Sequence, residues 1–270
     1  TRNSVHNIAT IHDIVVAKTP GLENLLYYDE YLRNSLVDHF FWPGTLQSDF
    51  AKGTHEAAGN FVNAPYQFKV DPRTGPQGSV RGLTSKSEVT LWYDGEIKRH
   101  EKSWPVRLEK TVSFSDKNGL ILEIEYNITS PEPRIPEPLP PSPFGEAHHC
   151  GGAHLTVIFA PEFNLSMLAG NAHDRNYYVD NQPNIGPLIS TGEARQETLF
   201  GIKDQYQKID ISLGLRKPAD IWHFPVQTVS QSEGGFELIY QSSVILPRWE
   251  ITLEPGKHWQ VKITKKVMLL

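Results

Sequence analysis

The chain has 270 residues, of which 39% are hydrophobic and 21% are charged, so its composition is that of a globular protein and excludes wholesale disorder. The formal net charge of −5, with no basic stripe in any region, excludes a general affinity for nucleic acid or for anionic membranes. No stretch approaches the roughly 20 apolar residues needed to cross a bilayer, and no basic-then-apolar leader begins the chain.

Cysteine usage and the first residue give two further expectations. Cys150 is the lone cysteine, which excludes an intrachain disulfide and fits a cytoplasmic location. The chain begins at Thr1 rather than at a methionine, from which we expect a piece of a longer polypeptide.

The first predicted element is helical. Thr19 is a suitable N-cap and Pro20 a suitable first helical residue, and leucines follow at helical spacing up to Tyr31. The next ten residues fit a helix or a strand, and periodicity does not decide between them. Pro43-Gly44 ends the segment in either case.

Strand patterns dominate from residue 89 onward. Val89–Tyr93 precedes Asp94-Gly95, which predicts a hairpin turn. A second alternating stretch runs from Val106 to Phe114. Asn118-Gly119 predicts another turn, into residues 120–128, where apolar and polar residues alternate as in a half-buried antiparallel strand.

The second half of the chain continues this pattern after an interruption. Residues 131–143 contain seven prolines and are expected to form an extended surface loop. Further strands are predicted at residues 154–159, 162–167, 209–215, 236–245 and 259–263. The predicted fold class is mainly β, an antiparallel architecture with a short N-terminal helical segment.

One cluster has the chemistry of a metal site. His148, His149, Cys150 and His154 carry imidazole and thiolate groups that could hold zinc. However, no second cysteine or carboxylate motif completes the pattern. We therefore interpret them as loop histidines and a buried thiol, and expect no metal and no cofactor.

A catalytic acid–base pair is not evident. Asp38 and His39 are adjacent, so on a strand their side chains point to opposite faces and do not act on each other. We expect one inward and one outward polar contact. Glu162, Glu193 and Glu233 are carboxylates of the right type for glycoside hydrolysis, but nothing in their spacing pairs them. We predict no catalytic residue in this chain.

Residues 222–235 form the most distinctive stretch. Trp222-His223-Phe224-Pro225 is followed by Ser230-Gln231-Ser232-Glu233-Gly234-Gly235, a dense mixture of aromatic, amide, hydroxyl and carboxylate groups. Such a mixture suits sugar recognition, since tryptophan faces stack on pyranose rings while planar polar groups bind pairs of hydroxyls. The same residues could instead lock a turn or face another domain.

Three blocks of sequence resemble a known family in the right order: residues 8–13 with 28–40, residues 59–66 (Gly59-Asn60-Phe61-Val62-Asn63-Ala64-Pro65-Tyr66), and residues 222–235. They resemble the C-terminal domain of glycoside hydrolase family 57 enzymes of the 4-α-glucanotransferase and α-amylase type. The proline-rich middle looks like an expansion relative to short members.

The resemblance implies a galactose-mutarotase-like β-sandwich packed against a catalytic (β/α) barrel. In the family the catalytic carboxylates lie on that barrel, which precedes the sandwich and is absent from this chain. The resemblance also implies that the chain lacks the first strands of the sandwich. Residues 1–270 are thus expected to form a single C-terminal-type domain.

The predicted function is that of a non-catalytic accessory domain of an enzyme acting on α-1,4-glucans, which supports the barrel and contacts glucan. Two alternatives are a structural module without ligand, favoured by a buried Trp222, and a freestanding mutarotase-like enzyme. The latter needs a histidine and a carboxylate in an open cleft, for which His154–Glu162 and His223–Glu233 are the candidate pairs. The residues predicted for glycan binding or a domain interface are Trp222, Gln231, Ser232, Glu233, Trp92, Arg33 and His39.

Overall fold

The computed structural model describes residues 29–71, 87–115, 119–131, 154–232 and 235–270. Within them the chain is almost entirely antiparallel β-structure, and the predicted fold class, an antiparallel β-sandwich, is confirmed. The predicted helix from Thr19 ends near the start of the first range, so most of it lies outside the described residues, as does most of the proline-rich segment. The elements are β1 (Val37–Phe41), α1 (Gln47–Lys52), β2 (Gln67–Val70), β3 (Ser87–Arg99), β4 (Lys102–Ser115), β5 (Leu120–Thr129), β6 (Leu155–Leu165), β7 (Arg175–Val179), β8 (Gln182–Gly186), β9 (Gly192–Asp204), β10 (Ile209–Ser232), β11 (Gly235–Leu253) and β12 (His258–Leu269).

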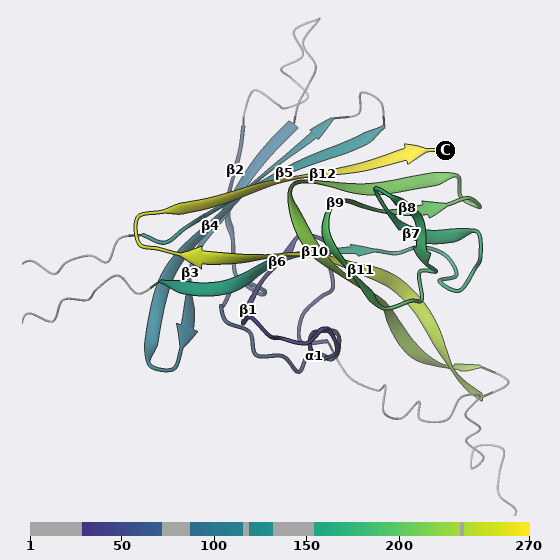
Figure 1. Ribbon diagram of the computed structural model, residues 1–270, viewed down its shortest axis with the longest axis horizontal. Coiled ribbons are helices and arrows are strands. Elements are labelled where there is room, and N and C mark those ends of the chain that lie inside the picture. Colours follow the sequence, from purple (N-terminus) through teal and green to yellow (C-terminus); the bar gives the residue numbers. More distant parts are fainter. Residues whose placement is uncertain (1–28, 72–86, 116–118, 132–153, 233–234) are drawn as a thin grey trace, which may run out of the picture.

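One hydrogen-bonded sheet, in the order β1-β6-β11-β10-β12-β5-β4-β3-β2, folds over on itself to give two layers (Figure 1). Strands β2 to β5 and β12 form one layer, and β1, β6, β11 and β10 form the other. The layers meet through contacts such as Tyr126 of β5 against Phe159 of β6, with ring centroids 5.2 Å apart. Strands β9, β7 and β8 extend the sheet beyond β10.

Strand β10 connects the two layers. Its first part, Ile209–Leu215, pairs with β12, and its second part, Asp220–Ser232, pairs with β11. The register with β9 shifts between Gly214 and Ala219, where the strand changes layer. Such an irregularity lets a long strand turn the corner of a sandwich.

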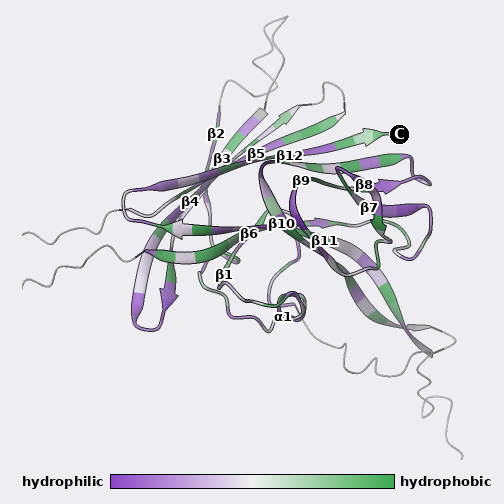
Figure 2. Cartoon of the chain, in the orientation of Figure 1, coloured by the Kyte–Doolittle hydropathy of each residue, from purple (hydrophilic) through white to green (hydrophobic). Residues whose placement is uncertain are grey.

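Alternating hydropathy along the strands determines which side chains fill the space between the layers (Figure 2). The main core contains Leu108, Ile124, Ile128, Val157 and Ile263, all at most 1% exposed. Strands β4 and β5 form the hairpin predicted at Asn118-Gly119, and Gly119 adopts φ 102°, a value that favours glycine.

The predicted hairpin at Asp94-Gly95 is wrong. Strand β3 runs through both residues, and the chain turns instead after Arg99, where His100 has φ 54°. A Cβ on Gly95 would lie 2.7 Å from Asn60 Oδ1 and 2.8 Å from the Phe61 ring. This glycine permits a close approach of the 59–66 segment rather than a turn.

Other elements refine the sequence interpretation. The undecided segment after residue 31 contains strand β1, and β6 is one strand where two were predicted. Strands β7, β8 and β9 and helix α1 were not predicted. Helix α1 covers the face of the β1-β6-β11-β10 layer that points away from the main core.

The inner face of the β2-β5/β12 layer continues beyond the area that the second layer covers. Cross-strand register places Phe68 of β2 beside Leu91 of β3, and Phe114 of β4 beside Leu122 of β5. These positions share the face that carries Ile124. We call its uncovered end the apolar overhang; its large exposed side chains, with their exposed fractions, are Phe68 (69%), Val70 (55%), Phe114 (40%), Leu120 (40%) and Leu269 (84%).

Candidate functional site

The candidate site lies on the outer face of the β1-β6-β11-β10 layer, defined as the face opposite the main core. A second apolar cluster occupies this face, consisting of Phe41, Phe50, Ile158, Ala160, Trp222, Phe224, Val244 and Leu246. Helix α1 covers the cluster by inserting Phe50, which is 1% exposed. The Gln47 amide donates hydrogen bonds to the carbonyls of Gly192 and His223, both 3.0 Å long, which fix the helix to the sheet.

Trp222 is the centre of this cluster and is 4% exposed. Its ring stacks on Phe41 with an interplanar angle of 3° and a centroid separation of 5.7 Å. The guanidinium of Arg248 lies 3.8 Å from the ring centroid on Trp222. Trp222 is therefore a support for Arg248 and is not itself available to stack on a sugar.

Arg248 is held on a second side by an acidic neighbour. Its Nη2 donates a hydrogen bond to Glu193 Oε1 over 2.6 Å. The other oxygen of Glu193, Oε2, accepts a hydrogen bond from Arg195 Nη2 over 3.2 Å. Burial lowers the pKa of Arg248, and the charges of Glu193 and Asp220 oppose that shift. The Nε of Arg248 is buried without a hydrogen-bond partner among the described residues.

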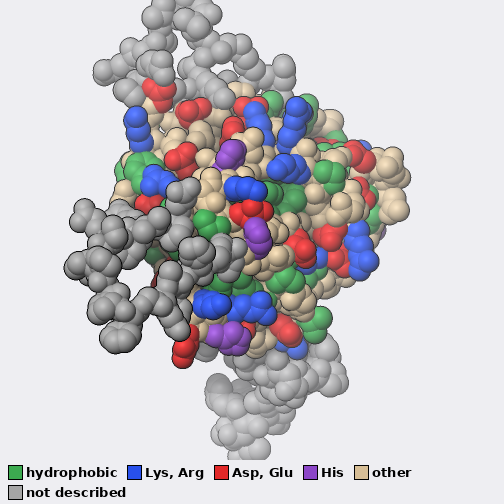
Figure 3. All heavy atoms as spheres, turned by 60° about the vertical axis from the view of Figure 1, so that its left-hand side comes forward, with side chains coloured by type: hydrophobic (Ala, Val, Ile, Leu, Met, Phe, Trp, Pro, Cys, Tyr) green, Lys and Arg blue, Asp and Glu red, His purple; other side chains and the backbone are tan. Residues whose placement is uncertain are grey.

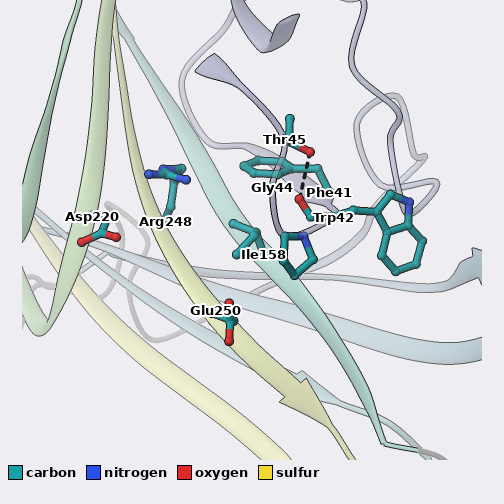
Figure 4. Close-up of a pocket in the computed structure, with 9 residues that line it drawn as sticks. Phe41, Trp42, Gly44, Thr45, Ile158, Asp220, Arg248 and Glu250 are labelled. Carbon is teal, nitrogen blue, oxygen red and sulfur yellow. Dashed lines mark hydrogen bonds between the residues drawn. The ribbon is translucent and has the colours of Figure 1, made fainter. Parts of the chain in front are cut away.

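A pocket of about 210 Å³ lies beside Arg248 (Figure 4). Asp220, Arg248 and Glu250 approach it from β10 and β11, and the segment Phe41–Thr45 approaches it from the other side. The Trp42 indole turns away from Arg248 in this view. The pocket therefore presents charged groups of both signs rather than an aromatic platform.

A buried polar cluster lies at the β1 end of the same face. His39 Nε2 is 3.0 Å from Glu162 Oε2, and the Tyr31 hydroxyl donates to the same oxygen over 2.6 Å. Arg33 Nη1 is 3.8 Å from Glu162 Oε1. The His39 and Glu162 side chains are 1% and 0% exposed, so this acid–base pair is closed to substrate.

The cluster ties the segment before β1 to the sheet and to α1. Arg33 donates to Asp29 over 2.6 Å and to the Ala51 carbonyl over 3.2 Å. Burial alone would lower the pKa of Arg33, but the charges of Tyr31 and Glu162 outweigh it, so the pKa is raised. The pKa of Tyr31 is raised by burial and by the charge of Glu162.

Asp38 and His39 point to opposite faces, as predicted. Asp38 Oδ2 accepts hydrogen bonds from Lys110 and from Tyr66, each 2.7 Å long. The expected polar contacts, one on the inward face and one on the outward face, are both present, since His39 contacts Glu162 on the opposite face. Both side chains are nevertheless buried, at 2% and 1% exposed. Both faces of β1 are covered, one by the β4 side of the sandwich and the other by α1.

The structure brings together three of the predicted site residues: Trp222, Arg33 and His39. Arg33 lies 5.8 Å from the Phe224 ring, and His39 lies 4.9 Å from the Phe50 ring, so all three border the second cluster. Trp92 is elsewhere, half-buried on β3 in the other layer, where Arg107 lies 5.7 Å from its ring.

Gln231 and Ser232 lie at the tip of the β10–β11 hairpin, paired through their backbones with Phe236 and Gly235. At about 3.3 Å per residue, the nine residues from Trp222 to Gln231 extend up to roughly 30 Å, so these residues do not form one site with Trp222. The side chains of Gln231 and Ser232, and Glu233 entirely, lie outside the described residues.

The histidine–carboxylate pairs proposed from the sequence fare differently. His154–Glu162 is wrong, since His154 Nδ1 is 3.7 Å from Glu254 and Glu162 contacts His39. His223–Glu233 lies partly outside the described residues. The candidate metal cluster also lies outside them, except for His154; among the residues that were described, no group of three or more His, Cys, Asp or Glu could hold a metal ion.

The sequence interpretation missed Asp220, Arg248 and Glu250. A signal was present, because Arg248 and Glu250 continue the face of Val244 and Leu246 at a spacing of two residues along β11. A charged pair that extends an apolar strand face indicates the edge of a covered surface. The pairing with Asp220, which lies opposite Arg248 on β10, required the register.

Two surface properties complete the description. Lys and Arg side chains are interspersed with Asp and Glu side chains on the face shown in Figure 3, in keeping with the absence of a basic stripe in the sequence. Within the described ranges, no helix is both long and apolar enough to cross a membrane.

Comparison with known proteins identifies the family. The family model described as alpha-amylase/4-alpha-glucanotransferase, C-terminal, matches residues 1–136 and 150–263. The unmatched residues 137–149 overlap the end of the proline-rich segment. The 4-alpha-glucanotransferase of Thermococcus litoralis is 25% identical over 240 residues, covering 89% of this chain and 28% of that protein. Alpha-amylase 1 of Dictyoglomus thermophilum is 25% identical over 259 residues, covering 94% and 31%.

The fold is shared with a solved structure. The crystal structure of the Thermococcus litoralis 4-alpha-glucanotransferase matches with a TM-score of 0.60 at 22% identity, over 92% of this chain and 29% of that chain. The chain thus spans less than a third of the length of these relatives. It belongs to the family of C-terminal domains of α-amylases and 4-α-glucanotransferases.

Proposed function

We propose that residues 1–270 form one accessory, non-catalytic sandwich domain of a polypeptide that acts on α-1,4-glucans. In this role the domain supports a catalytic (β/α) barrel supplied by the same or a companion polypeptide. The names of the relatives support the substrate class, and the share of their length that this chain covers leaves room for a catalytic part.

The observation that carries the supporting role is the apolar overhang. Phe68 and Val70 belong to β2, which is the last strand in the sheet order, and they are 69% and 55% exposed. Exposed apolar surface on a sheet edge is a feature of sites where another protein surface packs. We assign the barrel to this surface, because the relatives contain a further two thirds of polypeptide that needs a partner face.

The buried cluster of His39 and Glu162 supports the non-catalytic part of the proposal. Glycoside hydrolysis needs two carboxylates facing each other across a cleft, where a sugar can reach them. Glu162 is instead 0% exposed and engaged by His39 and Tyr31. The contacts of Glu162 with Tyr31 and Arg33 hold residues 29–33 against the sheet, so the role of this carboxylate is structural.

The supporting role is tested in the full-length polypeptide. The double variant Phe68→Ser, Val70→Thr is expected to shorten the half-life of glucan-converting activity on heating, because it weakens the barrel interface. The matched control is Tyr206→Ser, which alters an aromatic residue that is 72% exposed near β9 and is expected to have no effect. Equal half-lives for the double variant and the unaltered enzyme would contradict the docking assignment.

The substrate class is tested separately. The full-length polypeptide, incubated with maltotriose and with soluble starch, is expected to change the chain-length distribution, as followed by chromatography of the products. Absence of any change with both substrates would refute the proposed activity. Glucan turnover by the present 270 residues alone would refute the non-catalytic assignment.

A further inference from the structure

We propose that the pocket beside Arg248 is a glucan subsite that binds one glucose unit of an α-1,4-glucan, with Asp220, Arg248 and Glu250 as the groups that bind its hydroxyls. This inference rests on the proposed function for its substrate class and goes beyond it by assigning a site.

The size of the pocket sets the kind of ligand. Its volume of about 210 Å³ is below the roughly 300–1,000 Å³ of sites that enclose a drug-sized molecule. A volume of about 210 Å³ suits a single six-membered ring, and the neighbouring units of a chain would remain in solvent. Such a site holds a polymer at one point along its length.

The charges around the pocket select a neutral polyol. Asp220 and Glu250 line the pocket together with Arg248, and beside it Glu193 pairs with both Arg248 and Arg195. Three carboxylates thus stand against two guanidinium groups, and this excess of negative charge disfavours an anion. A metal cation would meet the guanidinium of Arg248 and would find no group of three or more suitable ligands among the described residues. Hydroxyl groups both donate and accept, and thus match a site of mixed sign.

The hydrogen-bonding capacity needed for a ligand is present. Asp220 Oδ1 accepts from the backbone and side-chain nitrogens of Gln196, at 3.1 and 3.0 Å, while no bond of the described residues engages Oδ2. Glu250 is exposed, and its carboxylate has no hydrogen bond or ion pair within the described part of the chain. Two planar carboxylates and a guanidinium are the groups that bind adjacent hydroxyls in pairs.

Arg248 is fixed before any ligand arrives. Trp222 supports its guanidinium at 3.8 Å and Glu193 binds it at 2.6 Å. A side chain already held in one rotamer loses little conformational entropy on binding, which favours affinity in a small site. This arrangement gives Trp222 a role in glucan binding that does not require exposure of its ring.

The test is a titration of the full-length polypeptide with maltotriose, in which binding is followed by the NMR chemical shifts of the protein or by the heat of binding. Glu250→Gln and Asp220→Asn are each expected to weaken a maltotriose-binding event by about tenfold and to raise the KM for soluble starch. Glu125→Gln is the matched control, since Glu125 is an exposed carboxylate on β5, and it is expected to change neither value. A titration with Ca²⁺ tests whether the pocket binds a cation instead. Glu250→Gln is expected to leave the response to Ca²⁺ unchanged.

The outcomes separate this inference from the proposed function. Unchanged maltotriose affinity and unchanged KM in both variants would overturn the subsite while leaving an enzyme that still converts glucan. A Ca²⁺ signal lost in Glu250→Gln would also overturn it, in favour of a cation site. Lack of any glucan conversion by the unaltered polypeptide would instead refute the proposed function. Circular dichroism of each variant confirms that a loss of binding is not a loss of fold.

Discussion

Protonation of His223 is expected to destabilise the fold in mild acid. The imidazole is 4% exposed, lies 4.6 Å from the Tyr177 ring and 5.4 Å from the Phe200 ring, and its Nδ1 has no hydrogen-bond partner among the described residues. A Cβ on Gly192 would lie only 2.7 Å from this ring, which shows how closely the backbone of β9 approaches. A charged imidazole here would be desolvated without a counter-ion.

The magnitude follows from the pKa. Burial lowers the pKa of His223 from 6.5 to about 4. Because the folded state favours the neutral form, this contribution to stability is fully present above pH 6.5 and is lost as the pH falls from there to about 4. At about 1.4 kcal/mol per pKa unit, the loss is roughly 3 kcal/mol, a large part of the ~5–15 kcal/mol by which domains are stable.

The assay is urea unfolding at pH 7.5 and at pH 4, followed by tryptophan fluorescence. Carboxylates also titrate in this range, so the informative quantity is the difference between the unaltered protein and His223→Gln, whose amide does not titrate. The variant is expected to lose roughly 3 kcal/mol less between the two pH values. His258→Gln, at an exposed position on β12, controls for loss of an imidazole and is expected to behave as the unaltered protein. Equal acid losses for the unaltered protein and His223→Gln would refute the reasoning.

Three further changes test the packing by thermal or urea unfolding. Gly95→Ala is expected to destabilise the fold by about 1–3 kcal/mol because its Cβ would overlap the Phe61 ring. Gly214→Ala is the control and is expected to be near neutral, because its Cβ would meet nothing closer than 3.8 Å. Equal effects of the two substitutions would contradict the close approach at Gly95. Lys110→Met is expected to destabilise by about 3–5 kcal/mol because it leaves the Asp38 carboxylate buried without its cation. Adding Asp38→Leu is expected to restore much of the lost stability, and a double variant as unstable as Lys110→Met would contradict this reasoning. Trp222→Ala is expected to cost about 3–5 kcal/mol, and a loss below about 1 kcal/mol would show that the second cluster is not well packed.

The candidate site illustrates the limit of reasoning from composition. Aromatic and polar density marked Trp222 as a candidate for glycan binding or for a domain interface. Its ring is 4% exposed and is not open to a sugar, because a tryptophan on a strand can be covered from outside. Its cover comes from Phe50 of α1, a helix of only six residues that is too short to show a helical period in the sequence. The acid–base pair was missed for a related reason, since His39 and Glu162 are 123 residues apart and meet only through the pairing of β1 with β6.

Residues 59–66 show that a family resemblance identifies a family but does not explain the structural role of the matching residues. In the structure Asn60 Oδ1 accepts from the Glu96 backbone over 3.0 Å, Phe61 is 1% exposed, and the Tyr66 hydroxyl binds Asp38. The block therefore holds the 59–66 loop against strands β3 and β1, and its role is structural.

The sequence by itself determined that the chain is an antiparallel β-protein, because alternation with a period of two distinguishes strands and the side to which each residue points. The family came from the resemblance of residues 59–66 and 222–235 to known members, and not from the alternation. Tertiary structure alone decided which sides are covered, where β3 turns and which distant charges meet. The physical reason is that alternation separates two faces of a strand but does not say what packs on either one. In β1 both faces are buried, in β2 all four residues are exposed, and only the register and the layers distinguish them.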